Sequence, residues 1–346
     1  MPYQKHTPSS FCYYIKCFDD NVYNKPPIVY TTETAEDDVA QVFIDLVEKD
    51  VKDIFTRFKY KEKMIFEEDD KEQYEKSTTC HICGEKLGKK DKVRDHCDLT
   101  GKFRGAAHKK CNLQYRVPKF IPVVFHNLSN YDPHLFIKKL KGKINCIPSS
   151  EEQYISFGKK LYIYSFTNED GENVDVFKVI RFIDSFKFMA SSLDALSKNL
   201  LKDQCKNLRK FYAEERQFNL LRRKGVYPYD YVDSVDKLTD TSLPTKEAFY
   251  SRLNEEDISD EDYEHAKTVW EEFNIKSLRK YHDIYNRSDV LLLADVFGNF
   301  RDVCIKNYNL DPAWYYTAPG LAWNAALKIT GVKLELLSDR DMLLMF

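Results

Sequence analysis

Apolar residues recur at three- and four-residue steps from Val39 to Phe55, and this period predicts an amphipathic helix over 39–55. A much longer helix is expected from about Ser277 to Tyr308. Runs of apolar β-formers instead predict strands, which stand at 27–30, 121–125, 161–166 and 176–183. Strands mixed with helices in one chain predict an α/β fold.

Polar positions add three further expectations. Leucines between Leu193 and Leu201 mark a helix, with Ser191 or Ser192 as its N-cap. Seven acidic residues in 255–264 are expected to cap a helix that runs through Trp270. Residues 61–76 hold seven acidic residues and four lysines, which is typical of a solvated helix face or a connector.

Composition narrows the class of protein. A length of 346 residues suggests roughly two domains. Lys and Arg number 53 and Asp and Glu 55, so a wholly basic nucleic-acid coat protein is excluded and a local basic site is not. No apolar run reaches the roughly 18 residues of a membrane span. The polar N-terminus lacks the apolar core of a secretory signal, so an intracellular protein that is not secreted is expected.

The nine cysteines of such a chain indicate metal binding rather than disulfides. Five of them stand among apolar neighbours and are expected to be buried thiols: Cys12, Cys17, Cys146, Cys205 and Cys304. The others lie in or near the most basic stretch, 80–119, which has eleven Lys or Arg against four Asp or Glu, a local net of +7.

Two knuckles in this stretch predict a metal site. Cys80-x2-Cys83 and His108-x2-Cys111 each supply two ligands from a tight turn, which suits one closed, structural Zn²⁺ site. The alternative is that these are ordinary reduced thiols.

Asp95, His96 and Asn112 stand between and beside the knuckles, where an Asp and an Asn can hold a divalent cation while a His deprotonates water. Together with the knuckles, Arg104-Gly105 and the run 95–101, this pattern resembles the HNH fold of the recombination endonuclease VII family. The resemblance implies His96 as general base and Asp95 and Asn112 as metal ligands. Asp98 stands where that family usually has a second His, so a zinc module that only binds DNA or braces the fold is the alternative.

A second candidate site follows the strand at 121–125. Asp132 comes shortly after this strand, and Tyr285 and Asp289 are four residues apart, so they share one face of the long helix. Cleavage of phosphodiesters by two metal ions needs carboxylates around ions about 3.5–4 Å apart. Asp283 and Asp295 lie on the same helix and are expected at the surface.

Asn127-x3-Tyr131-Asp132 and Tyr285-x3-Asp289 resemble the second and third exonuclease motifs of family B DNA polymerases. Further segments resemble the protein-primed family B polymerases of polinton-type transposons and related viruses, some of which carry the same zinc and HNH-like insert. These segments are 93–113, 121–140, 182–189, 243–270 and 311–320. The resemblance implies a ribonuclease H-like 3′–5′ exonuclease domain, a mixed sheet with helices, and a small inserted ββα zinc module.

The same resemblance implies roles for single residues. Asp132 and Asp289 would bind Mg²⁺ or Mn²⁺, Asn127 would position the primer end and Tyr285 would orient the attacking water. Ser192-Leu193-x2-Leu196 fits a motif that contacts single-stranded DNA, and Lys224 is the candidate for a lysine near the site. Phe125 and Tyr131 either stack on frayed bases or pack in the core.

The implied partners are a single-stranded 3′ end, duplex or branched DNA, and a terminal protein that primes synthesis, in a nuclear or viral setting. The first exonuclease motif, an Asp-x-Glu on an apolar strand, is missing. Asp70-x-Glu72 and Asp262-x-Glu264 have its spacing but stand in charged runs. The family pattern places this motif before residue 1 and the palm aspartates beyond residue 346, after the apolar residues 343–346.

We therefore expect a fragment that alone neither polymerises nor proofreads efficiently. Its expected parts are 1–76, the start of the exonuclease domain; 77–120, the insert; 121–307, the main exonuclease-like domain; and 308–346, the start of the polymerase domain. Two other hypotheses stay open: a zinc-containing endonuclease centred on Asp95, His96 and Asn112, and a non-catalytic remnant that binds DNA in a salt-sensitive manner.

Overall fold

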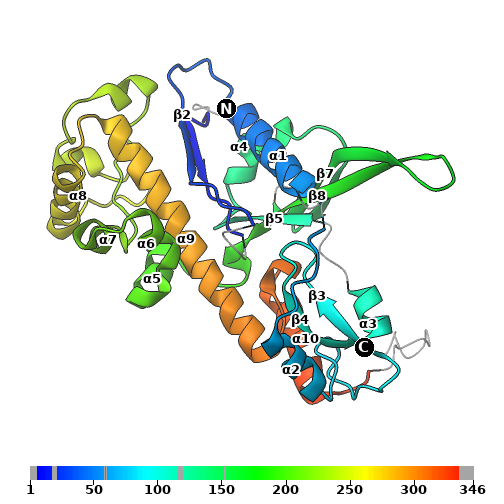
Figure 1. Ribbon diagram of the computed structural model, residues 1–346. Coiled ribbons are helices and arrows are strands. Elements are labelled where there is room, and N and C mark those ends of the chain that lie inside the picture. The colour runs from blue at the N-terminus through cyan, green and yellow to red at the C-terminus, as the bar shows by residue number, and fades with distance from the viewer. Residues whose placement is uncertain are drawn as a thin grey trace, which may run out of the picture.

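The computed structural model describes residues 6–17, 22–57, 59, 61–115, 120–151 and 153–334 (Figure 1). The strands are β1 (Ser10–Tyr13), β2 (Ile28–Thr31), β3 (Lys92–His96), β4 (Phe103–His108), β5 (Phe120–Phe125), β6 (Ile144–Pro148), β7 (Tyr154–Thr167) and β8 (Asn173–Asp184). The α-helices are α1 (Val39–Arg57), α2 (Glu68–Lys76), α3 (Lys109–Gln114), α4 (Asp132–Phe136), α5 (Leu193–Lys198), α6 (Lys206–Phe211), α7 (Glu215–Leu221), α8 (Asp260–Glu272), α9 (Leu278–Tyr308) and α10 (Ala318–Thr330).

A mixed sheet in the order β5-β8-β7-β6 forms the centre of the first lobe. β5 runs parallel to β8, whereas β7 is antiparallel to both β8 and β6. The strands predicted at 121–125, 161–166 and 176–183 are confirmed within β5, β7 and β8. β5 is an edge strand of this sheet, and its other side faces β1 and α9 across a cavity.

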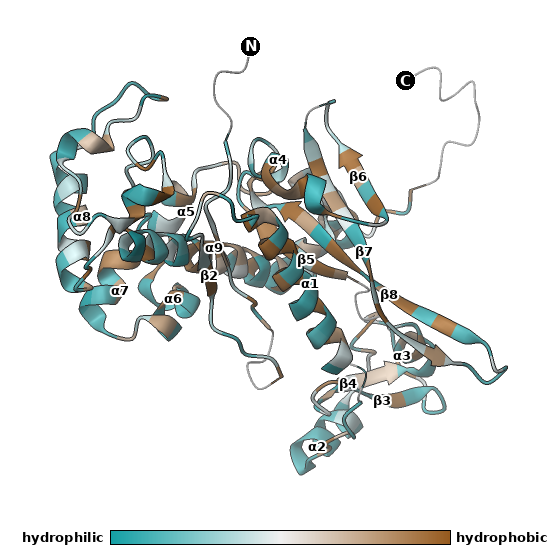
Figure 2. Cartoon of the chain, turned by 90° about the horizontal axis from the view of Figure 1, so that it is seen from above, coloured by the Kyte–Doolittle hydropathy of each residue, from teal (hydrophilic) through white to brown (hydrophobic). Residues whose placement is uncertain are grey.

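The predicted amphipathic helix is confirmed as α1, which packs on the sheet through its apolar face. Phe43 and Val47 of α1 join Phe136 of α4 and Phe157 and Phe182 of the sheet in one core. Figure 2 shows apolar residues along β5 and α4, while α2 is mostly hydrophilic.

The long helix α9 carries a second lobe, which consists of α5 to α8 and their connections (Figure 1). Ser277 accepts a hydrogen bond from the Lys280 N–H and caps the start of α9, and Asn309 ends it in the left-handed conformation at φ 50°. Leu208 and Phe218 pack against Leu278 and Leu291 of α9 in a core separate from that of the sheet. The predicted helices at 277–308 and around 260–270 are thereby confirmed, and Ser192 is the N-cap of α5.

A small module of β3, β4 and α3 lies below the sheet in Figure 1, and α2 belongs to it. The acidic side chains of α2 are solvated, as expected, but its Tyr74 and the preceding Phe66 pack on Phe103 of β4, with ring centroids 5.2–6.4 Å apart. Aromatic contacts inside the charged run therefore hold α2 to the hairpin, and the domain boundary at residue 77 stays a prediction.

Two expectations about burial are wrong. Cys146 is exposed, because β6 is the outer strand of the sheet. Asp295 is 1 % exposed instead of lying at the surface, because it accepts hydrogen bonds from the N–H groups of Asn207 and Leu208 at the start of α6. Residues 343–346 lie outside the described part of the chain. No described helix is both long and apolar enough to cross a membrane.

Candidate active site and metal cluster

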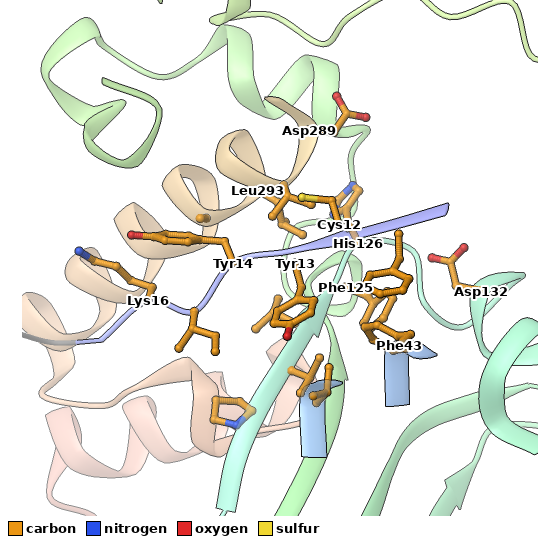
Figure 3. A pocket seen from close by; sticks show the side chains of 18 of the residues that line it. Cys12, Tyr13, Tyr14, Lys16, Phe43, Phe125, His126, Asp132, Asp289 and Leu293 are labelled. Atoms are coloured by element: carbon orange, nitrogen blue, oxygen red, sulfur yellow. The ribbon is translucent and has the colours of Figure 1, made fainter. Parts of the chain in front are cut away.

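A cavity of about 590 Å³ is lined by residues of β1, α1, β5 and α9. Its walls are mostly apolar and include Phe43, Phe125 and Leu293. Figure 3 shows Asp132 and Asp289 at its rim, one after β5 and the other on α9. Two aspartates that are far apart in the sequence therefore line one cavity.

Asp132 is the first residue of α4, and Pro133 follows it inside the first turn. Burial raises the pKa of Asp132 to about 6, and the negative charge of Asp184 acts in the same direction. A carboxylate whose pKa is raised by burial and a like charge gains most when a cation neutralises it.

Asp289 projects from α9, and its buried Oδ1 atom has no hydrogen-bond partner among the described residues. Burial raises its pKa to about 6, while the positive charge of Lys224 and a hydrogen bond from Tyr285 oppose this shift. A buried carboxylate oxygen without a partner is costly, so this atom is well suited to a cation that enters the cavity.

Tyr285 is buried beside Asp289, and its hydroxyl also meets the hydroxyl of Tyr229. The segment that carries Lys224 and Tyr229 approaches α9 at Gly225, where a Cβ atom would stand 2.8 Å from the Tyr285 ring. The missing side chain of Gly225 thus allows Lys224 to come near Asp289, although the two residues belong to different elements.

Asp184, at the end of β8, was not singled out in the sequence, and it organises the loop before Asp132. This carboxylate is fully buried and accepts hydrogen bonds from the N–H groups of Asn127 (2.8 Å) and Ser129 (3.1 Å). Asn127 adopts a left-handed conformation at φ 66°. The only sequence signal for Asp184 is a carboxylate at the end of an apolar strand.

Two other residues with expected roles line the cavity, and a third, next to Asp132 in the sequence, lies at the surface. Leu193 and Phe125 line the cavity. Phe125 also packs against the sheet core, which is one of the two alternatives predicted for it. Tyr131 is 49 % exposed, and its ring meets the His6 ring edge-on at a centroid distance of 5.8 Å.

The four residues of the two knuckles form a second, separate group. The ligand atoms of Cys80, Cys83, His108 and Cys111 all lie within 4.8 Å of one another and could hold a metal ion such as zinc. Burial acts against ionisation of Cys80, but hydrogen bonds from backbone N–H groups outweigh it and lower its pKa to about 6. A thiolate is the form that binds metal, so this shift favours a metal site.

The residues expected for an HNH-type site are Asp95, His96 and Asn112, and the carboxylate of Asp95 is already hydrogen-bonded. Asp95 is 2 % exposed, and its two oxygens are 2.8 Å from His81 Nε2 and from an Arg104 guanidinium nitrogen. His96 is partly exposed, with its Nε2 3.9 Å from Asp98. A metal ion on Asp95 would have to displace His81 or Arg104, and the roles of Asp95, His96 and Asn112 stay predictions.

The model of the family "DNA polymerase type B, organellar and viral" matches residues 113–335, which is more than half of the chain. The chain belongs to the type B DNA polymerases of organelles and viruses. No curated protein and no solved structure matches it. Asp132 and Asp289 of this type B polymerase lie inside the matched region, whereas the knuckles end just before it. Membership of the family supports DNA synthesis as its reaction, DNA as its partner and divalent metal ions as its cofactors.

Proposed function

We propose that this type B polymerase chain carries the 3′–5′ exonuclease-like region of a protein-primed polymerase of the polinton type, acting on DNA in a nuclear or viral setting. The observation that carries the proposal is that Asp132 and Asp289 line one cavity, with no hydrogen-bond partner for Asp289 Oδ1 among the described residues. A terminal protein would be the primer, and a single-stranded 3′ end would be the substrate of the exonuclease site.

Asp132 and Asp289 would hold Mg²⁺ or Mn²⁺. Such an ion supplies Lewis-acid stabilisation of the phosphate and a hydroxide nucleophile near neutral pH. Tyr285 would orient the attacking water, and the position of its hydroxyl beside Asp289 supports this role. Asn127 would position the primer end at the mouth of the cavity, and Lys224 would offset the negative charge there.

Two carboxylates are fewer than a two-metal site needs, and the cavity has room for more. The edge of β5 that faces the cavity pairs with no described strand. We propose that an apolar strand with the Asp-x-Glu motif sits there, pairs with β5 and brings its acidic side chains between Asp132 and Asp289. The apolar walls and the two aspartates that line the cavity support this arrangement.

Binding of Mn²⁺ to the purified, zinc-loaded chain tests the site, with electron paramagnetic resonance as the measurement. We expect Asp289→Asn to weaken binding by at least about tenfold, because loss of a ligand exceeds the usual effect of an outer-shell partner. Asp283→Asn on the same helix is the matched control, since Asp283 accepts a hydrogen bond from Thr31 and does not line the cavity. Equal Mn²⁺ binding by both variants would refute the proposed site.

The same chain should digest single-stranded DNA slowly at most, because no Asp-x-Glu pair of the described residues lines the cavity. Robust digestion that is lost in Asp132→Asn would show that two carboxylates suffice and that the proposed strand is not needed.

We also propose that the Cys and His cluster holds a structural Zn²⁺ ion, since four protein ligands close a tetrahedral site. DNA cleavage by an HNH-type centre is the alternative. The contacts of Asp95 do not favour it, because both of its oxygens are held by His81 and Arg104.

A further inference from the structure

The module that contains the metal cluster presents lysines on one of its sides. Lys86, Lys89, Lys90, Lys109 and Lys110 are all exposed. Within the described residues, none of these five lysines forms an ion pair. The chain as a whole has a net charge of −2, so this positive charge is concentrated locally and not spread over the surface.

The metal ligands and their neighbours hold these lysines together. His108 Nε2 lies 3.1 Å from the carbonyl oxygen of Lys86, and Lys109 and Lys110 stand between His108 and Cys111. The Lys109 N–H donates to the carbonyl oxygen of Asp91 at 2.9 Å, which fixes the turn after Lys90 against the start of α3. The lysines therefore share one rigid frame whose centre is the Cys and His cluster.

The charge of the module is divided between its two sides. Acidic α2 packs against β4, while α3 lies at the other side of the hairpin (Figure 1). Leu113 and Tyr115 are exposed next to the lysines, and the Arg104 guanidinium stacks on the Tyr115 ring at 4.2 Å. An anionic partner is thus attracted more strongly to the α3 side, because on the α2 side Lys92 and Arg94 lie over the Tyr74 ring, next to the acidic residues of the helix.

We propose that the lysine face, defined as Lys86, Lys89, Lys90, Lys109 and Lys110, is a second DNA-binding surface that contacts the phosphate backbone of duplex DNA. The chain belongs to a DNA polymerase family, so DNA is the expected anionic partner. The positive lysines complement the negative phosphates of the DNA backbone. None of the five lysines lines the cavity, so the surface is separate from the exonuclease-like site. The ionic contacts release counterions, and binding should weaken steeply with salt.

The hydrogen bonds of Asp95 favour DNA binding over DNA cleavage by this module. Both of its oxygens are already used, by His81 and Arg104, and His81 belongs to the first knuckle. Asp95 thus ties the knuckle to β3 and stabilises the frame of the lysine face.

The test is the affinity of the zinc-loaded chain for a fluorescent 30-base-pair duplex, measured by anisotropy at several salt concentrations. In a variant with all five lysines changed to Gln, we expect at least about tenfold weaker binding and a salt slope lower by about one for each lysine in contact. Changing the same five lysines to Arg should preserve affinity within about threefold, because phosphate contacts need the charge.

A matched control changes four exposed lysines outside the module, Lys276, Lys280, Lys306 and Lys333, to Gln and should bind like the parent chain. Zinc content verifies that the five-lysine variant keeps its frame. Equal losses in both Gln variants, or an unchanged salt slope, would overturn the proposal. The readouts differ, duplex affinity here and Mn²⁺ binding for the exonuclease-like site, so the two tests can fail separately.

Discussion

The carboxylate of Asp184 illustrates how a single residue positions the candidate site. It accepts four hydrogen bonds, from the N–H groups of Asn127, Ser129 and Phe186 and from the Ser129 hydroxyl, at 2.8–3.1 Å. These bonds hold the loop that leads to Asp132, including the left-handed Asn127. The same arrangement brings a second negative charge near Asp132. This charge raises the pKa of Asp132 in the same direction as burial does.

We expect Asp184→Ala to lower the free energy of unfolding by about 3–5 kcal/mol, because several buried donors lose their acceptor. Asp184→Asn should cost less, since one acceptor oxygen remains. Asp175→Ala, on the exposed part of β8, removes a surface hydrogen bond and should change stability by about 0.5 kcal/mol or less. Urea unfolding followed by circular dichroism measures all three, and equal stability of the Ala variants would contradict the role of Asp184.

At the scale of elements, the first knuckle is attached to the β3–β4 hairpin through His81. Its N–H donates to the Ala106 carbonyl oxygen, its ring reaches Asp95, and its ring atoms pack against Gly105. A Cβ atom at Gly105 would lie 2.9 Å from His81 Cγ, and the φ of +152° at this position disfavours other residues. Metal affinity should therefore depend on a residue that is not a ligand.

Gly105→Ala should weaken Zn²⁺ binding about five- to 150-fold, which corresponds to about 1–3 kcal/mol of strain in the metal-bound form. Gly88→Ala in the same module is the control, because a Cβ atom there meets no atom within 4 Å. Competition with a chromogenic chelator measures both affinities. A Gly105 variant that binds zinc as tightly as the Gly88 variant would show that His81 does not support the site.

Across the whole molecule, the periodicity of the sequence predicts helices and strands well, but it does not predict the tertiary contacts between them. The apolar stripe of α1, the run in β5 and the pattern of α9 are local, so they could be recognised without a fold. The burial of Asp295 could not, because its partners at Asn207 and Leu208 are far away in the sequence. The motif residues Asp132 and Asp289 were singled out by resemblance, but their common cavity and the part of Asp184 appear only once the chain is folded.

A buried histidine connects the two lobes through α9. The His282 ring lies 2.7 Å from the Tyr227 hydroxyl in the second lobe and 2.6 Å from the Ser10 hydroxyl of β1. Burial lowers the pKa of His282 to about 4. Because the folded-state pKa lies below the unfolded value of about 6.5, the neutral ring contributes stability above pH 6.5, and this contribution is lost as the pH falls toward 4.

The linkage predicts that this group alone makes the chain about 2 kcal/mol less stable at pH 5 than at pH 7. The raised pKa values of Asp132 and Asp289 act in the opposite sense, since protonation of these groups favours the folded state as the pH falls through 6. The effect of His282 is therefore the difference between the parent chain and His282→Gln. Urea unfolding at pH 7, 6 and 5 should show the advantage of the parent shrinking by about 2 kcal/mol. The control is His134→Gln, on the exposed face of α4, whose free energy of unfolding should change with pH as that of the parent does. If the free energy of unfolding of His282→Gln also followed the parent, the His282 ring would not be the source of acid sensitivity at the junction of β1 and α9.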